Sequence, residues 1–283
     1  MNKFVKTENV FHIESIGYAL DRVFPPDFVY DGESHPSVEF VYVQSGKLEV
    51  VEEEKVYIME AGELIVHGPM KFHRLKSTGN TSPHVYNLSA FISGKAPERL
   101  YGGVFRLDKL EQDSFLKIFQ NARQFEASHN PDCYLGQEIA SELGAFVVRI
   151  SRTASASNKL SDEPCAAVYR NLVKTMNKEI YSNLTLSDIA AREHISVSYV
   201  KALFYRYAGI SPKSYYISLR TNEAARLLSK DMPISEISEK MNFSSPNYFS
   251  LFFKKHVPKS ARYKVSLSSL SRLYKILSGF KSR

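Results

Sequence analysis

Two segments in the last third of this 283-residue chain repeat one another. Leu186-Ser-Asp-Ile189 matches Ile234-Ser-Glu-Ile237 at an offset of 48 residues, and Tyr199–Phe204 matches Tyr248–Phe253 at an offset of 49. Each copy has the periodicity of a short helix, a tight corner and a second helix, which is the helix-turn-helix pattern. A continuous helical pattern over 212–229 separates the copies. This region is therefore expected to be all-α, with two helix-turn-helix units joined by one long helix.

The first unit has the caps and the two faces that such a fold needs. Thr185 or Ser187 is placed to cap its first helix, and Ser196 is placed to cap its second. Residues on the same face of a helix recur three or four positions apart, which sorts the second helix into an inner and an outer face. The inner face is expected to hold Val200, Leu203, Phe204 and Tyr207, and the outer face Ser198, Lys201, Ala202 and Tyr205.

The second unit repeats this arrangement with one residue more in its corner. Ser244 or Ser245 is expected to cap its second helix, and Pro246 takes a first-turn position, where its missing N–H does no harm. Asn242 and His194 stand at the two corners, where a left-handed backbone is expected. The inner face is expected to hold Tyr248, Phe249, Phe252 and Phe253, and the outer face Asn247, Ser250, Leu251 and Lys254.

The charge of the chain is divided unevenly between its two halves. From Cys165 onward there are 20 Lys and Arg against 7 Asp and Glu, a net +13, whereas residues 1–164 carry 17 against 23, a net −6. Positive charge confined to under half of a chain favours an anionic partner, nucleic acid before membrane. Charge alone leaves solvated lysine faces equally open.

Cysteine usage and hydropathy bear on the compartment. Cys133 and Cys165 are too few for a disulfide framework and lack the paired spacing of a zinc site, so a reducing cytoplasm is expected. No window has the continuous apolar length of a signal peptide or a membrane span. The chain is expected to be soluble and unexported.

The N-terminal half has the pattern of short strands. The segments over 38–44, 47–52 and 55–59 are rich in β-branched and aromatic residues and are separated by turn pairs such as Ser45-Gly46 and Ala61-Gly62. Even spacing of short strands is typical of an antiparallel barrel or jelly roll, which is expected over about residues 8–105.

Two helical stretches and a polar segment follow. The pattern predicts helices over 113–123 and 135–150, and the second carries an apolar stripe that must be buried. The stripe is expected either to pack on its own barrel or to pair with the same helix of a second chain in a two-fold dimer. Residues 151–164, which are polar and rich in Ser and Ala, are expected to form a linker.

The paired units resemble the DNA-binding domain of the AraC/XylS family of transcription regulators, over nearly all of residues 166–264. Ala202 and Leu251 depart from the family, because many members carry arginine at those positions, and the closing turn after Lys255 is shortened. A tail over 265–283 has the pattern of an extra amphipathic helix. The resemblance rests on Leu186-Ser-Asp-Ile-Ala190, Ile195-Ser196, Tyr199, Leu203-Phe204, Gly209-Ile-Ser-Pro212, Arg220, Ala224, Leu227-Leu228, Ile234-Ser-Glu-Ile237, Phe243-Ser-Ser245, Tyr248-Phe-Ser250 and Phe253-Lys-Lys255.

The N-terminal half is similar to the cupins in the spacing of its polar residues and glycines. His35, Glu39 and Gly46 match the first cupin motif, and Gly62 and His73 match the second. Glu33 stands where metal cupins have the first histidine of His-x-His. The conventional ligand positions would be Glu33, His35, Glu39 and His73, a plausible set for iron or manganese. The favoured interpretation is a metal-free barrel, in which His35 and His73 lie near the mouth and either bind a small molecule or satisfy backbone groups at strand ends, so neither a metal nor a cofactor is predicted. His12, His67 and His84 are isolated in sequence and are expected to have surface or core roles.

Roles in DNA recognition follow from which residues face outward. Lys201 is the first candidate for a base-edge contact. Asn247 is expected to make a bidentate contact to adenine, and Leu251 offers apolar contact to a thymine methyl group. Four basic residues are expected either to contact phosphates or to support the fold: Arg206, Arg220, Lys254 and Lys255. The full set of base-edge candidates is Ser196, Ser198, Lys201, Ala202, Tyr205, Ser245, Asn247, Ser250 and Leu251.

The predicted fold class is α+β with several domains: a cupin-like antiparallel β-barrel with two helices, then an all-α domain of two helix-turn-helix units. The expected divisions are a sensor or dimerisation domain over 1–150, a linker over 151–164, a DNA-binding domain over 165–264 and a tail over 265–283. The leading hypothesis is a sequence-specific transcription regulator, and an activator, whose barrel senses a small molecule and signals through the helices and linker.

The expected partners are double-stranded DNA, a small-molecule effector, RNA polymerase and a possible second copy of the chain, in the cytoplasm at the nucleoid, with no membrane and no catalytic residues. Two other hypotheses are open from the sequence. One is a cupin metalloenzyme carrying a helix-turn-helix module, and the other is a nucleoid-type protein that binds DNA without sequence preference.

Overall fold

The computed structural model describes residues 8, 10–95, 97, 100–128, 132–153 and 160–256. The amphipathic helix predicted for the tail over 265–283 lies outside the described residues. Within the described part of the chain, no helix is both long and apolar enough to span a membrane.

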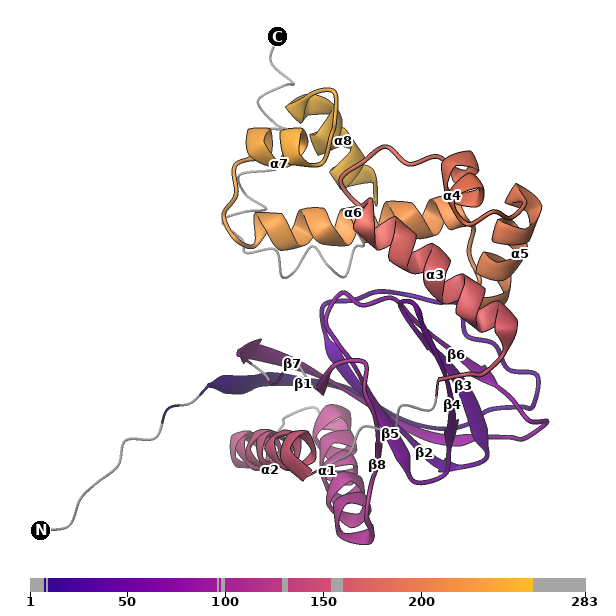
Figure 1. Ribbon diagram of the computed structural model, residues 1–283. Coiled ribbons are helices and arrows are strands. Elements are labelled where there is room, and N and C mark those ends of the chain that lie inside the picture. The colour runs from indigo at the N-terminus through magenta and orange to yellow at the C-terminus, as the bar shows by residue number, and fades with distance from the viewer. Residues whose placement is uncertain are drawn as a thin grey trace, which may run out of the picture.

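The N-terminal half is an antiparallel β-barrel made of two facing sheets, as predicted (Figure 1). Gly46 and Gly62 adopt the left-handed backbone at two of its turns, with φ of 78° and 84°, which glycine tolerates best. A buried apolar cluster that includes Val41, Val50 and Met59 fills the space between the sheets. The five-stranded sheet has the order β1 (Phe11–Val23), β7 (His84–Gly94), β2 (Val38–Ser45), β5 (Glu63–His67) and β8 (Val104–Arg106), and the three-stranded sheet has the order β4 (Lys55–Glu60), β3 (Lys47–Glu52) and β6 (His73–Ser77).

Helices α1 (Lys109–Ala127) and α2 (Cys133–Thr153) cover the outer side of the five-stranded sheet (Figure 1). Asp108 begins α1 with a capping box, in which its side chain accepts from the backbone N–H of Glu111. The apolar stripe of α2, including Phe146, is buried in one cluster with α1 and the barrel. Of the two alternatives for this stripe, the structure therefore shows packing within the chain.

The C-terminal half contains the two predicted helix-turn-helix units. They are α4 (Leu186–Arg192) with α5 (Val197–Tyr207), and α7 (Ile234–Lys240) with α8 (Pro246–His256). Between them lies α6 (Pro212–Leu228), and α3 (Pro164–Lys178) precedes them.

Caps and corners explain where these helices begin and turn. Thr185, Ser196 and Ser245 each accept a hydrogen bond from the backbone N–H three residues later, at 3.2, 3.1 and 3.1 Å. Both corner residues, His194 and Asn242, have the predicted left-handed backbone, each with φ of 54°.

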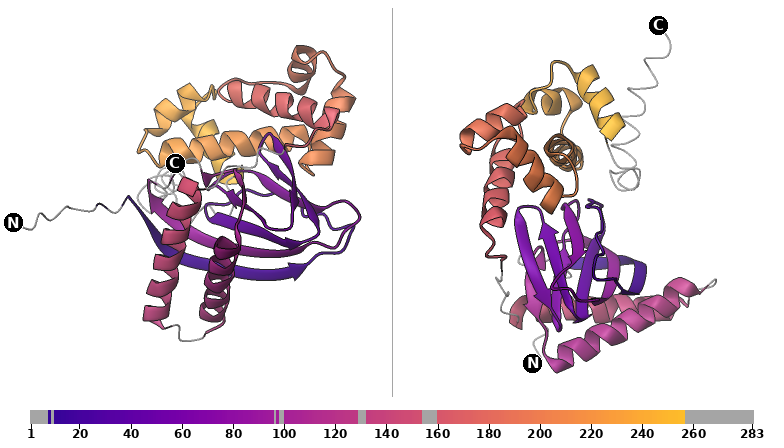
Figure 2. Two further views of the ribbon diagram at one scale, coloured as in Figure 1. Left: turned by 60° about the horizontal axis from the view of Figure 1, so that its bottom comes forward. Right: turned by 90° about the vertical axis from the view of Figure 1, so that its right-hand side faces the viewer.

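The two halves touch directly, and the linker is not their only connection (Figures 1 and 2). Phe72 of the segment before β6 packs on Tyr215 of α6, with ring centroids 5.0 Å apart. Tyr169 of α3 donates a hydrogen bond to the carbonyl of Glu53 at 3.2 Å. One buried cluster contains side chains from both halves, so the barrel and the helical half share part of their core.

Candidate DNA-reading surface and sensor cluster

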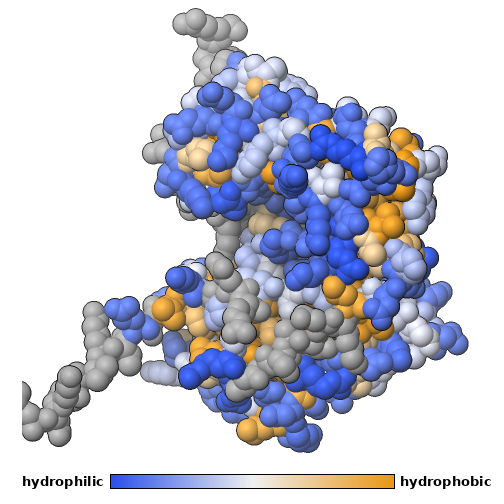
Figure 3. Space-filling view, viewed as in Figure 1, coloured by the Kyte–Doolittle hydropathy of each residue, from blue (hydrophilic) through white to orange (hydrophobic). Residues whose placement is uncertain are grey.

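The outer face of α5 is exposed as predicted. Ser198, Lys201, Ala202 and Tyr205 all lie at the surface, and Ser196 is exposed at the cap. Lys201 and Tyr205 line a groove whose other wall includes Lys213 of α6. The visible face of the helical half is mostly hydrophilic (Figure 3), which suits a polar partner better than an apolar one.

The outer face of α8 is exposed with one exception. Asn247, Lys254 and Lys255 lie at the surface, and Leu251 is 61% exposed. Ser250 is only 3% exposed, and its hydroxyl donates to the carbonyl of Pro246 at 2.8 Å. The prediction that Ser250 faces outward is therefore wrong. Its small side chain shares the buried face of α8 with Phe249 and Phe253.

Two tyrosines at matching positions of the units are exposed. Tyr199 is 41% exposed on the first turn of α5, and Tyr248 is 56% exposed on the first turn of α8. The aromatic spacing predicted that Tyr248 faces inward, which is wrong. A signal for exposure was present in the sequence, because each tyrosine lies three residues after the capping serine, in the turn that a DNA-reading helix presents first.

Arg220 of α6 is buried, with 5% of its surface exposed. Its guanidinium donates to the carbonyls of Ser182 and Met241 and lies over the ring of Phe243, 4.7 Å from the centroid. A buried charge is tolerated when it is hydrogen-bonded and in contact with an aromatic face. Of the two roles expected for Arg220, phosphate contact and support of the fold, the structure shows the second, because this side chain joins the segment before α4 to the corner before α8.

The other predicted phosphate contacts differ in their surroundings. Nη2 of Arg206 lies 2.7 Å from Oε2 of Glu163, the residue before α3, and about half of the Arg206 side chain is exposed. Lys254 and Lys255 are exposed in the last turn of α8, with no ion pair among the described residues. These two lysines are therefore more available for contact with a DNA phosphate than Arg206, which is already paired with Glu163.

A cluster of histidines and carboxylates lies inside the barrel, at the end that faces the helical half. It contains three of the four residues predicted from the cupin spacing, His35, Glu39 and His73, all buried. Glu33 is exposed at its edge and accepts a hydrogen bond from the Tyr30 hydroxyl at 2.6 Å. One donor atom from each of the four predicted residues lies within 4.8 Å of the others.

His67 and Glu52 extend this cluster. Nδ1 of His67 lies 2.5 Å from Oε2 of Glu52, and its ring stacks on His73 with centroids 4.3 Å apart. His67 pairs with Glu39 across β2 and β5, and His73 pairs with Glu52 across β3 and β6. A surface or a core role was expected for His67, and the structure shows the core role. Although His67 is isolated in sequence, it lies beside the other residues of the cluster in space. Only the strand register brings these residues together.

The hydrogen bonds of the imidazoles show which nitrogen faces the cluster. Nδ1 of His35 lies 3.2 Å from the carbonyl of Ser37, and Nδ1 of His73 lies 3.0 Å from the carbonyl of Lys71. A carbonyl oxygen only accepts, so Nδ1 of His73 donates to Lys71, whereas Nδ1 of His35 also lies 2.9 Å from the Ser37 hydroxyl, which can either donate or accept. The Nε2 atoms of His35, His67 and His73 and Oε1 of Glu39 are buried and have no aligned hydrogen-bond partner among the described residues.

These donor atoms fit a metal ion. Nε2 of His35 lies 2.8 Å from Oε1 of Glu39, and Nε2 of His73 lies 3.5 Å from Oε2 of the same carboxylate. At such distances either a proton or a metal ion between the paired atoms would join them. Metal-binding histidines commonly anchor their other ring nitrogen on a carbonyl or carboxylate, as these do. Imidazole and carboxylate donors together suit manganese, iron, cobalt, nickel or zinc.

The pKa values in the cluster follow from burial and from Glu39. Burial and the neighbouring His73 lower the pKa of His35 to about 4, so this imidazole is neutral at neutral pH. Burial also lowers the pKa of His73, but the contact with Glu39 and its charge outweigh burial and raise it.

Comparisons with known proteins match the two halves separately. Residues 189–262 match a helix-turn-helix domain family, and residues 23–90 match a cupin domain family. The chain is 28% identical over 183 residues to the uncharacterized HTH-type transcriptional regulator YtdP of Bacillus subtilis, covering 63% of this chain and 22% of YtdP.

Two further relatives are also regulators. The chain is 25% identical over 259 residues to the uncharacterized HTH-type transcriptional regulator YisR of Bacillus subtilis, covering 79% of this chain and 85% of YisR. It is 32% identical over 93 residues to the lactose operon transcription activator of Staphylococcus xylosus, covering 32% of this chain and 33% of that protein. The chain thus spans most of YisR but only a third or less of the other two relatives.

Proposed function

We propose that the chain is a transcription regulator of the AraC/XylS type, which binds specific DNA sites and controls transcription in response to an effector in the barrel. The proposal is supported by the matches to a helix-turn-helix domain family and a cupin domain family, and by relatives that are named as regulators. The observation that carries this proposal is the pair of exposed outer faces on α5 and α8, held on one domain by α6. Two such helices can enter successive major-groove segments on one side of a duplex.

The finer features of the proposal are these. The sensing half is assigned to residues 1–150, the linker to 151–164 and the DNA-binding half to 165–264. Activation is the proposed direction, because one relative is named a transcription activator. RNA polymerase is the proposed protein partner, a homodimer the proposed assembly, and the cytoplasm and nucleoid the proposed location. No catalytic step is assigned to the barrel, since the named relatives are regulators.

Selection of DNA by the purified full-length chain tests the proposal. Duplexes with a random central region are bound, recovered, amplified and sequenced. We expect enrichment of one discrete site with two contacted segments about 10 base pairs apart, one helical turn. Footprinting of the enriched duplex should protect both segments on one face. Binding with no enriched sequence would instead identify a nucleoid-type protein and reject the regulator.

Substitutions on the outer faces should separate base contacts from phosphate contacts. Lys201→Ala or Asn247→Ala should cost about 1–3 kcal/mol of binding and relax the preference at one base pair. Lys254→Ala should weaken all sequences alike and lower the slope of log affinity against log salt by about one. Ser250→Ala is the control, because its buried hydroxyl cannot reach DNA. Equal effects of the first three changes on every sequence would contradict the assigned roles.

A further inference from the structure

We infer that a divalent transition-metal ion held by His35, Glu39 and His73 sets the DNA affinity of the chain, and that residues 68–74 carry its occupancy to the helical half. This inference rests on the proposed function, because it names the effector of that regulator. Residues 68–74, the connection from β5 into β6, are called the readout segment below. The segment touches the metal-binding cluster on one side and α5 and α6 on the other.

Alternation along β6 places neighbouring side chains on opposite faces. Successive residues of a strand point to opposite sides, so a residue that points into the barrel lies between two that point out. His73 is the inward residue and reaches Glu39. Phe72 and Arg74 on either side reach the helical half: Phe72 packs on Tyr215, and Nη1 of Arg74 donates to the carbonyl of Arg206 at 2.7 Å. A shift of His73 therefore moves two side chains that hold α5 and α6.

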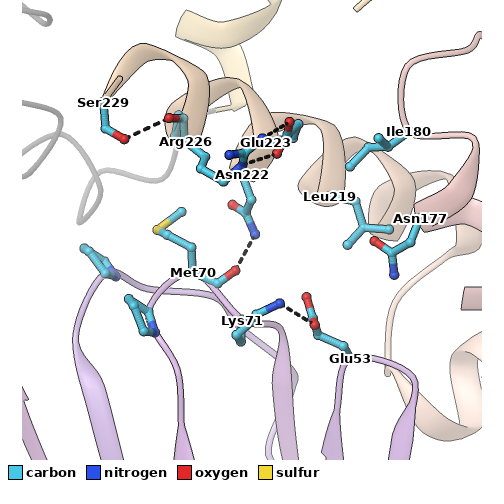
Figure 4. A pocket seen from close by; sticks show the side chains of 13 residues that line it. Glu53, Met70, Lys71, Asn177, Ile180, Leu219, Asn222, Glu223, Arg226 and Ser229 are labelled. Atoms are coloured by element: carbon cyan, nitrogen blue, oxygen red, sulfur yellow. Dashed lines mark hydrogen bonds and ion pairs between the residues drawn. The ribbon is translucent and has the colours of Figure 1, made fainter. Parts of the chain in front are cut away.

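Met70 makes a second connection, through its backbone. Its N–H donates to the carbonyl of His35 at 2.7 Å, and its carbonyl accepts from Nδ2 of Asn222 on α6 at 2.9 Å (Figure 4). Met70 has a φ of 61°, in the left-handed region that a side chain of this size rarely adopts. One strained residue thus connects a metal ligand to α6, at a place where strain is commonly tied to switching.

A cleft beside the readout segment gives it room to move. The cleft has a volume of about 460 Å³ and lies between Pro36, Met70 and Lys71 of the barrel and Leu219, Asn222 and Arg226 of α6 (Figure 4). The two cations on its walls are each paired with a carboxylate: Lys71 with Glu53 at 2.6 Å, and Arg226 with Glu223 at 2.6 Å. The walls thus carry no unpaired cation to fix an anion there, and the segment has space on its outer side.

The chemistry of the cluster favours a cation as the signal. Nε2 of His35 and Nε2 of His73 lie 2.8 and 3.5 Å from the two oxygens of the Glu39 carboxylate, so the three side chains converge on one point. An ion bound among these donor atoms would draw His35 and His73 toward a common centre with Glu39. Because packed elements respond to small shifts by moving as units, displacement of these two histidines reaches α5 and α6 through the readout segment.

Metal titration of the chelator-treated, full-length chain tests the site without reference to DNA. Manganese, cobalt, nickel and zinc are each added and followed by calorimetry, and cobalt also by its visible absorption. We expect about one ion per chain, with affinity at least about tenfold weaker in His73→Gln and Glu39→Gln. His84→Gln is the matched control, because His84 is a barrel histidine paired with Asp21 outside the cluster. Absence of binding, or binding unchanged in the two cluster variants, would overturn the inference.

DNA affinity of the metal-free and metal-loaded chain tests the link, on the duplex recovered by selection. We expect at least about a tenfold difference in the wild-type chain, and less than about threefold in Asn222→Ala with its metal stoichiometry intact. Metal binding that leaves the wild-type DNA affinity unchanged would overturn the inference. If selection recovers no site, the proposed function fails and the inference with it, whereas the titration still reports on the cluster alone.

Discussion

Replacing Arg220 by methionine is expected to lower the free energy of unfolding of the helical half by about 2–5 kcal/mol. Methionine retains much of the apolar volume but leaves the carbonyls of Ser182 and Met241 without their donor. A buried polar group without a partner costs about 1–3 kcal/mol, and the contact with the ring of Phe243 is lost as well. The measurement is urea unfolding of the full-length chain, followed by helical circular dichroism.

Arg226→Met is the matched control for this change. It lies on the same helix, is about half exposed and pairs with Glu223, so its replacement should cost only about 0–1 kcal/mol. DNA affinity should fall in Arg220→Met because Met241 belongs to the corner that sets α8. An unchanged unfolding midpoint with reduced DNA affinity would instead support the phosphate role that the sequence predicted for Arg220, and would contradict the structural role assigned here.

The features that could be predicted from sequence are those determined by neighbouring residues. Helix periodicity and capping serines located both helix-turn-helix units, and the two corners needed a left-handed backbone whatever else the fold did. Ser196 and Ser245 bond to N–H groups three residues away, so their partners are near in sequence. Such contacts form within a segment, and one sequence is enough to infer them.

The features that were missed depend on residues far apart in sequence. The outward position predicted for Ser250 came from an ideal helix, but the buried face of α8 is displaced around the helix from that pattern, so that Ser250 is buried and Tyr248 is exposed. Nothing near Arg220 in sequence shows that two carbonyls, 38 and 21 residues away, will surround it. His67 joined the cluster through its register with Glu39, 28 positions earlier, which no local pattern reveals.

The direct contacts between the barrel and the helical half could not be predicted from the sequence pattern either. The polar stretch over 151–164 predicted communication through a linker, since that is where the composition changes. The contacts that the structure adds come from Phe72, Met70 and Arg74, which lie more than 130 residues from their partners on α5 and α6. A linker can be recognised by composition, whereas a direct contact depends on how two folded surfaces fit.

Arg74→Met is expected to loosen α5 from the barrel and to abolish most of the metal response. The buried guanidinium of Arg74 donates to the carbonyls of Arg206 and Tyr207 at 2.7 and 3.3 Å, in the last turn of α5. A cation is favoured at this end of a helix, where the carbonyls are unpaired and the dipole is negative. Losing it should cost about 1–3 kcal/mol for each carbonyl left unsatisfied, so amides at 204–210 should exchange with solvent at least about tenfold faster.

Lys76→Met separates this effect from a general loss of charge on β6. Lys76 lies two residues further along the strand, on the same face, and it is partly exposed. The Lys76→Met variant should have the same amide exchange in α5 and the same metal response of DNA affinity as the wild-type chain. Arg74→Met should keep the metal stoichiometry, since Arg74 is not among the donor residues. If Arg74→Met speeds exchange in α5 and yet retains the full metal response, then α5 is not part of the route, and the signal passes through Met70 and Asn222 to α6 alone.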